Sequence, residues 1–214
     1  MRNSFDMQLR KLNNELIEMG SLIETAIARA YKGLINQNIE IAKENVEFDR
    51  EIDQKEKEVE NICLKLLLQQ QPVARDLRQI SAALKMITDM ERIGDQASDI
   101  AEIIGFLNGR IGLDAQYICQ MAVAAMRMVT ESVEAYVKRD VAMAEATIQH
   151  DDVVDDLFLK VKDSLIQMIS ENPKDGEYAL DLLMIAKYFE RIGDHATNIA
   201  EWVVFSVTGV HEQG

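Results

Sequence analysis

The 214-residue chain contains only two prolines and ten glycines, so few of its positions can break a helix or form a tight turn. An all-β sandwich or barrel needs many turns rich in these residues, which this chain does not supply. Apolar residues instead recur every three or four positions, as at Ile80, Ala83, Ile87 and Met90. The sequence therefore predicts an all-α protein of a few long amphipathic helices.

Five short segments combine the residues that end helices. They are residues 33–38, 71–72, 105–112, 138–140 and 172–176. The intervals between them predict six helices of roughly 25–33 residues, each about 40–50 Å long. Helices of this length indicate an elongated bundle.

An internal repeat sets the domain organisation. Residues 91–102 read ERIGDQASDIAE and residues 190–201 read ERIGDHATNIAE, which are identical at nine of twelve positions. We therefore expect two tandem three-helix bundles, at residues 1–107 and 108–214, related by a pseudo-twofold internal repeat. Each copy has a glycine in mid-helix, Gly94 and Gly193, although glycine costs about 1 kcal/mol there relative to alanine. Either another helix or a ligand is expected to approach the backbone at these positions.

The net charge of the chain argues against one class of binding partner. With 37 acidic and 23 basic residues the formal net charge is −14, which argues against a nucleic-acid groove. The amphipathic N-terminus does not resemble a signal peptide, and no stretch approaches about 18 consecutive apolar residues. We expect a soluble cytoplasmic protein in which Cys63 and Cys119 are buried free thiols.

Carboxylates occupy one face of the helices in each repeat. On a helical wheel Glu91, Asp95 and Asp99 fall within about 80° of one another, opposite the apolar face. Across an antiparallel hairpin, residues at one level share a constant sum of residue numbers. That sum is 144 for Asp53 with Glu91 and for Asp49 with Asp95, which places the turn at the proline of residue 72.

The second repeat has the same arrangement. The sum is 345 for Asp155 with Glu190 and for Asp151 with Asp194, which places the turn near residues 172–173. Each half is therefore expected to hold four carboxylates at one height along the bundle.

Four such carboxylates repel one another unless a positive charge compensates them. One alternative is a salt-bridge network with Arg50, Arg92 and Arg191. The other, which we favour, is a metal site with oxygen ligands on the bundle surface. His150 and His195 are level with the second cluster and are candidate additional ligands. The sequence contains no Glu-x-x-His motif, which argues against a buried di-iron oxygenase core.

The sequence resembles the PhoU family of bacterial phosphate-uptake regulators over essentially its whole length. The resemblance rests on MRNSFDMQL at residues 1–9, PVARDLR at residues 72–78, and the two ERIGD segments with the residues that follow them. It implies multinuclear iron or zinc clusters, held by pairs of acidic residues four positions apart, and a homodimer in several members. Carried over by position, the implied ligands are Asp49, Asp53, Glu91, Asp95 and Asp99 in the first half, and Asp151, Asp155, Glu190, Asp194 and Asn198 in the second. Because Asn198 has no charge, the two sites are expected to differ.

The same resemblance implies a role without catalysis. It predicts a cytoplasmic negative regulator of phosphate uptake that links the ATPase of a Pst-type phosphate transporter to a PhoR-type sensor kinase and meets the membrane only through these partners. The sequence shows no nucleophile-base motif and no phosphate-binding loop, which agrees with an adaptor. Two alternatives stay open: a carboxylate-bridged metalloenzyme and a metal-free helical scaffold.

Overall fold

The structure is a computed structural model that describes residues 2–69, 72–107, 110 and 115–210. The α-helices in these residues are α1 (Arg2–Asn36), α2 (Ile39–Gln69), α3 (Ala74–Ile104), α4 (Gln116–Lys138), α5 (Val141–Gln149), α6 (Asp151–Glu171) and α7 (Gly176–Thr208). Two short 3₁₀ helices, η1 (Gly105–Leu107) and η3 (Pro173–Asp175), follow α3 and α6. The described ranges contain no strand, and the predicted all-α class is confirmed.

The helices end where the chain carries helix-breaking residues. Gln37 after α1 and Arg139 after α4 both adopt left-handed conformations, with φ of 54° and 57°. These residues lie within the predicted breaks at 33–38 and 138–140. Residue 71 of the 71–72 break and residues 108–109 and 111–112 of the 105–112 break are outside the described residues.

The helix predicted between residues 140 and 172 is bent at one residue. The amide of His150 donates to the carbonyl oxygens of both Ala146, at 3.2 Å, and Thr147, at 3.1 Å. This tighter turn separates α5 from α6, and the two pieces together take the place of one of the six predicted helices.

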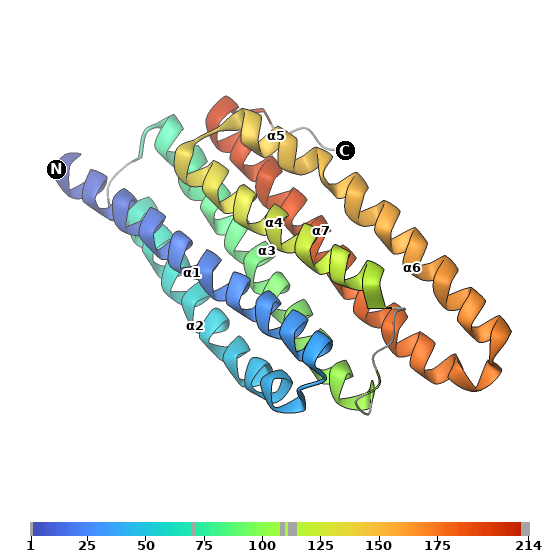
Figure 1. Cartoon of the computed structure of the whole chain (residues 1–214). Coiled ribbons are helices and arrows are strands. Elements are labelled where there is room, and N and C mark those ends of the chain that lie inside the picture. Colours follow the sequence, from blue (N-terminus) through green and yellow to red (C-terminus); the bar gives the residue numbers. More distant parts are fainter. Residues whose placement is uncertain (1, 70–71, 108–109, 111–114, 211–214) are drawn as a thin grey trace.

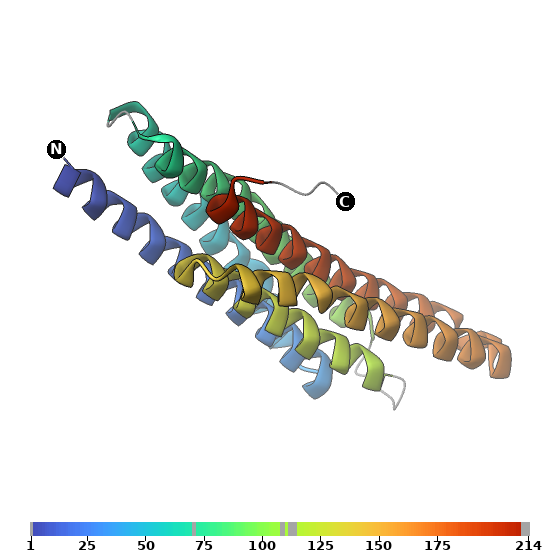
Figure 2. The ribbon, with the colours of Figure 1, turned by 90° about the horizontal axis from the view of Figure 1, so that it is seen from above.

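The helices form two layers along a common direction (Figures 1 and 2). In one layer the neighbours are α2 with α3, α3 with α7, and α7 with α6. Helices α1 and α4 contact each other and cover this layer, α1 on α2 and α3, α4 on α7 and α6. The most extensive helix pair is α3 with α7, one from each repeat, so the two halves are joined through their ERIGD helices.

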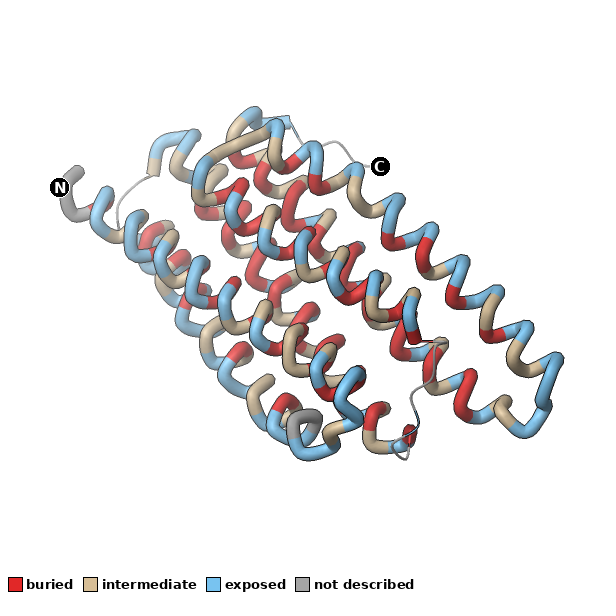
Figure 3. Tube along the Cα trace, viewed as in Figure 1, coloured by how far each residue is buried: buried red, intermediate tan, exposed pale blue. Residues whose placement is uncertain are grey.

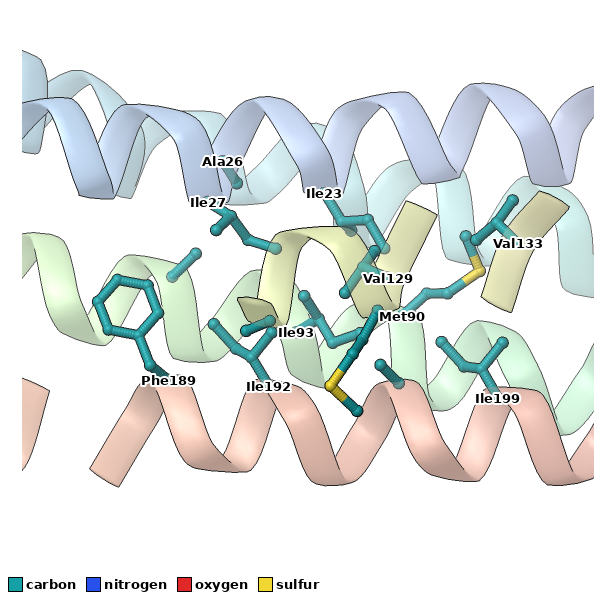
Figure 4. Packing of buried hydrophobic residues seen from close by; sticks show 14 of the residues in the cluster. Ile23, Ala26, Ile27, Met90, Ile93, Val129, Val133, Phe189, Ile192 and Ile199 are labelled. Atoms are coloured by element: carbon teal, nitrogen blue, oxygen red, sulfur yellow. The ribbon is translucent and has the colours of Figure 1, made fainter. Parts of the chain in front are cut away.

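One hydrophobic core runs through both halves, and Figure 3 shows buried residues following the inner side of the helices. In Figure 4, Ile23 of α1, Ile93 of α3, Val129 of α4 and Ile192 of α7 meet in this core, and all four are fully buried. Burying each such side chain contributes about 1.5–3 kcal/mol. Because α2 and α6 also contribute buried residues to it, such as Ile52 and Val154, the core holds the acidic segments of α2, α3, α6 and α7 at fixed relative heights.

Two further predictions concern membrane-spanning helices and the burial of the two cysteines. Among the described helices, none is both long enough and apolar enough to cross a membrane. Cys63 is buried as expected, whereas Cys119 is only half-buried. Cys119 lies on the wall of a groove of about 680 Å³ that is also lined by residues of α6.

Candidate metal centre

In the first half the predicted carboxylates of α2 and α3 come together. Asp49 lies against the backbone of α3, where a Cβ built on Gly94 would be 3.0 Å from Asp49 Oδ1. Burial, followed by the charges of Asp95, Asp53 and Asp99, raises the pKa of Asp49 to about 6. The charges of Asp95, Asp53 and Asp99 contribute to this raised pKa, so these carboxylates lie near Asp49, which the hairpin arithmetic alone left open.

The second half repeats this geometry on α6 and α7. A Cβ built on Gly193 would lie 3.2 Å from Asp151 Oδ1. Burial raises the pKa of Asp151 to about 6, with further contributions from Asp194, Asp155 and Glu190. Asp49 and Asp151 are therefore equivalent residues, each seated beside the mid-helix glycine of the adjacent helix. The close approach at these glycines is that of an acidic side chain and of the apolar residue three positions after it, Ile52 or Val154, on a neighbouring helix.

Basic residues compensate only part of each cluster. Arg92 Nη1 lies 3.5 Å from Asp95 Oδ2, and Arg92 Nε lies 3.6 Å from Glu91 Oε2. In the second cluster Lys187 forms an ion pair with Glu190. Neither Arg50 nor Arg191 forms an ion pair within the described part of the chain. A salt-bridge network therefore accounts for one base in each cluster and leaves an excess of carboxylate.

The acidic clusters also contain a buried oxygen atom without a partner. Asp49 Oδ1 is inaccessible to solvent and accepts no hydrogen bond. A buried carboxylate oxygen in this state costs free energy unless a donor or a cation supplies the missing interaction. In the described residues, however, no three carboxylate, imidazole or thiol side chains converge closely enough to hold one ion as they stand. Ion binding therefore requires the half-exposed carboxylates to rotate inward, which their mutual repulsion opposes until a cation is present.

The interface between α3 and α7, called the seam below, contains residues that the sequence analysis assigned to the second acidic cluster. Asp89 Oδ1 lies 2.9 Å from His195 Nδ1 and accepts a hydrogen bond from Asn198 Nδ2 at 3.1 Å. Farther along α3, Tyr188 of α7 lies near Asp99 and acts against the effect of burial by lowering the pKa of that carboxyl. His195 and Asn198 thus bridge the two repeats.

Comparison of equivalent residues in the two repeats, at their offset of 99 residues, indicates these contacts between α3 and α7. Asp99 corresponds to Asn198, and Tyr188 corresponds to Asp89, so both partners change together between the two pairs. His150, the other candidate imidazole, lies 3.1 Å from Glu131 of α4 rather than beside Asp151 or Asp155. Both histidines therefore have carboxylate partners outside the acidic clusters.

The contacts across the seam also set the relative height of the two clusters. Because α3 and α7 are antiparallel, the pairing of Asp89 with His195 brings Glu91 level with Asp194, and Asp95 level with Glu190. The two acidic clusters therefore lie side by side on the α2, α3, α7 and α6 layer.

A family model for the PhoU domain matches this chain twice, at residues 16–104 and 118–203. The two matches cover most of the chain and include both ERIGD helices. The chain belongs to the PhoU family.

Relatives of the same family are similar over almost the whole length. A phosphate-specific transport system accessory protein PhoU homolog of Clostridium acetobutylicum is 37% identical over 210 residues, covering 97% of this chain and 96% of the relative. A homolog of the same description from Deinococcus radiodurans is 32% identical, with 99% of this chain and 100% of the relative covered. The crystal structure of PhoU from Pseudomonas aeruginosa superposes with a TM-score of 0.92 at 31% identity, covering 96% of this chain and 100% of that one.

The PhoU fold also persists at lower identity. The crystal structure of the phosphate transport system regulatory protein PhoU from Streptococcus pneumoniae has a TM-score of 0.89 at 23% identity, covering 98% of this chain and 99% of that chain. At that identity the similarity concerns the fold alone.

The donor set of this PhoU chain fits a hard or borderline divalent cation. The clusters supply carboxylate oxygens, the ligands that such cations accept. Asp49 Oδ1 lacks a partner, and the glycines at 94 and 193 let the carboxylates of Asp49 and Asp151 approach the backbone of the adjacent helix. The residues that would hold a cation are Asp49, Asp53, Glu91 and Asp95 in the first half, and Asp151, Asp155, Glu190 and Asp194 in the second. Asn198 is directed to Asp89 instead, so its assignment as a ligand has the least support.

Proposed function

We propose that this chain is an accessory regulator of a phosphate-specific transport system, which restrains phosphate uptake and phosphate-starvation signalling from the cytoplasm. The observation that carries the proposal is its whole-length similarity to accessory proteins of such systems, at 37% and 32% identity. The partners we propose are the ATPase subunit of a Pst-type transporter and a PhoR-type sensor kinase, with a homodimer as the regulatory unit. The chain acts by contact with these proteins and catalyses no reaction of its own.

Each half of this regulator is proposed to hold a cluster of iron or zinc ions on its acidic face. The support is the paired carboxylates on α2 with α3 and on α6 with α7, together with the raised pKa of Asp49 and Asp151. A bound cluster supplies positive charge that offsets the repulsion between these carboxylates. The protein residues orient the cations and hold the two hairpins at one level. Because bound cations add positive charge to the acidic face, metal occupancy changes the surface charge.

Half-exposed helix faces favour this regulatory role over metalloenzyme chemistry. Asp155 and Asp194 of the second cluster are exposed, whereas two-metal catalysis requires a shaped cavity that excludes water. The carboxylate-bridged enzyme therefore has less support than the adaptor.

Elemental analysis tests the metal clusters. A variant with Glu91→Gln, Asp95→Asn, Glu190→Gln and Asp194→Asn should lose the iron or zinc that copurifies with the wild-type protein. The matched control changes four exposed acids outside the clusters, Glu44→Gln, Glu47→Gln, Glu145→Gln and Asp163→Asn, and should retain the metal. Equal metal content in the two variants would show that the assigned residues are not the ligands.

Gene replacement tests the regulatory role. Deletion of the gene should activate phosphate-starvation genes in phosphate-rich medium, and the wild-type copy should restore repression. If repression persists in a strain that lacks every copy of this family, the regulatory proposal is wrong.

A further inference from the structure

Three arginines gather at the end of the bundle opposite the η3 turn. Arg75 and Arg78 lie in the first turns of α3, about 60° apart around the helix, and Arg139 follows the last residue of α4. Figure 1 shows the start of α3 and the ends of α4 and α7 at this same end of the molecule. The segment of α3 involved is PVARDLR, a motif that the acidic clusters do not use.

Hydrogen bonds to Gln79 fix the position of Arg139 beside the start of α3. Arg139 Nη1 donates to Gln79 Oε1 at 3.4 Å, and Tyr136 Oη donates to the Gln79 carbonyl oxygen at 3.3 Å. Burial and the charges of Arg75 and Arg78 lower the pKa of Arg139, which agrees with three guanidinium groups in one neighbourhood. Arg78 is held from the other side, since a Cβ on Gly209 would lie 3.5 Å from its Nε and Cζ atoms.

No carboxylate of the described residues neutralises this cluster by an ion pair. Within the described residues neither Arg75, Arg78 nor Arg139 forms an ion pair, although the chain carries an excess of acids. Other arginines do find partners: Arg110 pairs with Asp175 and Arg127 pairs with Glu131, each at 2.7 Å.

The two acids nearest in sequence, Asp76 and Asp140, do not change this result. Asp140 accepts a hydrogen bond from the Met143 amide as the N-cap of α5. Asp76 is about 160° from Arg78 around α3. The Nε atom of Arg78 is buried and has no hydrogen-bond partner. This atom is a donor that lacks an acceptor at a site with excess positive charge.

The backbone contributes to the same environment. Val73, at the N-cap of α3, forms no side-chain cap, so the first amides of this helix lack the acceptor that Ser, Thr, Asn or Asp would supply. At the repeat offset of 99 residues, Arg75 corresponds to Lys174 and Arg78 corresponds to Glu177, while Asp76 corresponds to Asp175. The two helix starts therefore differ in charge at the position of Arg78, which is basic in the first repeat and acidic in the second.

We propose that Arg75, Arg78 and Arg139 form a binding site for a phosphate-type oxyanion, with free inorganic phosphate as its ligand. A doubly charged tetrahedral anion accepts hydrogen bonds from several guanidinium groups at once and interacts favourably with the positive end of α3. Arg75 and Arg78 lie about 20–24 Å along α3 from Glu91. The site is independent of the acidic clusters, so its failure would leave the proposed function untouched.

The competing explanation is structural. Arg78 and Arg139 lie at the C-terminal ends of α7 and α4, where cations offset the helix dipole. This explanation leaves Arg75 without a role and predicts no response to phosphate.

Calorimetric titration with inorganic phosphate up to about 10 mM at constant ionic strength, with chloride as the reference anion, separates the two explanations. Arg78→Gln combined with Arg139→Gln should weaken phosphate binding by about ten-fold or more, the loss expected for charge-assisted hydrogen bonds. Arg127→Gln removes an arginine from the middle of α4 and should leave the affinity within about two-fold.

Thermal melts with and without phosphate keep the test valid if the double variant is less stable. Phosphate should raise the Tm of the wild type and of the Asp49→Asn, Asp151→Asn variant, but not that of the arginine variant. The proposal is overturned if the wild type binds no phosphate, if the arginine variant binds it equally well, or if the Asp49→Asn, Asp151→Asn variant loses the binding, because the phosphate would then be held at the acidic clusters.

Discussion

The carboxylate of Asp49 on α2 fills the space that a side chain at Gly94 on α3 would need. A Cβ at residue 94 would lie 3.0 Å from Asp49 Oδ1 and 2.9 Å from Ile52 Cδ1, and Ile52 is fully buried. At the equivalent position in the second half the fit is looser, since a Cβ on Gly193 would lie 3.2 Å from Asp151 Oδ1 and 3.5 Å from Val154 Cγ1. The two mid-helix glycines therefore differ in how strictly they are required.

Substitution of each glycine by alanine tests this difference. In Gly94→Ala the displacement of Asp49 and Ile52 outweighs the gain in helix propensity, and we expect a loss of about 1–2 kcal/mol in unfolding free energy. In Gly193→Ala the two effects nearly cancel. Urea unfolding of both variants measures the difference, and an equal loss in the two would contradict the unequal spacing.

The acidic clusters predict an unusual response to pH in metal-free protein. The pKa values of Asp49 and Asp151 are about 6 in the folded state against a reference value of 3.8. Between these values the folded state binds more protons than the unfolded state, so stability should rise as the pH falls from about 7 to about 5. The Tm of chelator-treated protein measures this effect.

The variant with Asp49→Asn and Asp151→Asn is the control for the pH experiment. It should be more stable than the metal-free wild type at neutral pH and should show a smaller gain on acidification. A cation that binds at neutral pH should likewise raise the Tm of the wild type, because it replaces the missing proton. A wild-type Tm that falls between about pH 7 and about pH 5 would refute the explanation.

Asp89 is predicted to hold the two repeats together across the seam between α3 and α7. In Asp89→Ala both His195 and Asn198 lose their acceptor, and we expect a loss of about 1–2 kcal/mol in unfolding free energy with little change in the m-value. A double-mutant cycle with Asn198→Ala measures the coupling between the two residues. Asp163→Asn, at an exposed position, should have almost no effect on stability. A coupling energy near zero would show that the contact between Asp89 and Asn198 does not stabilise the association of the two repeats.

The two thiols should differ in reactivity. Burial raises the pKa of Cys63 to about 12 and also raises the pKa of the half-buried Cys119. Because the thiolate is the reactive form, Cys63 should resist an aromatic disulfide reagent until the protein unfolds, whereas Cys119 should react slowly in the native state. Labelling of Cys63→Ser and Cys119→Ser assigns each phase, and rapid native labelling of Cys63 would contradict its burial.

Several features of the site follow from local sequence alone. Helical periodicity places the acids opposite the apolar face, and the turn near residue 72 sets the level of Asp49 and Asp53 against Glu91 and Asp95. The repeat predicts the second cluster in the same way. The partners of His195 and Asn198 could not be found by this reasoning, because Asp89 lies more than a hundred residues away and belongs to the other repeat.

The sequence by itself determined the helices, the tandem repeat and the height of the carboxylates within each hairpin. It could do so because helix geometry and a short turn act on neighbouring segments. Only the tertiary structure decided that α3 and α7 form the central pair, that the two acidic clusters lie level with each other, and that Arg139 joins Arg75 and Arg78. These arrangements depend on side-chain packing between helices that no short turn connects, so the residues that meet there have no fixed spacing along the chain.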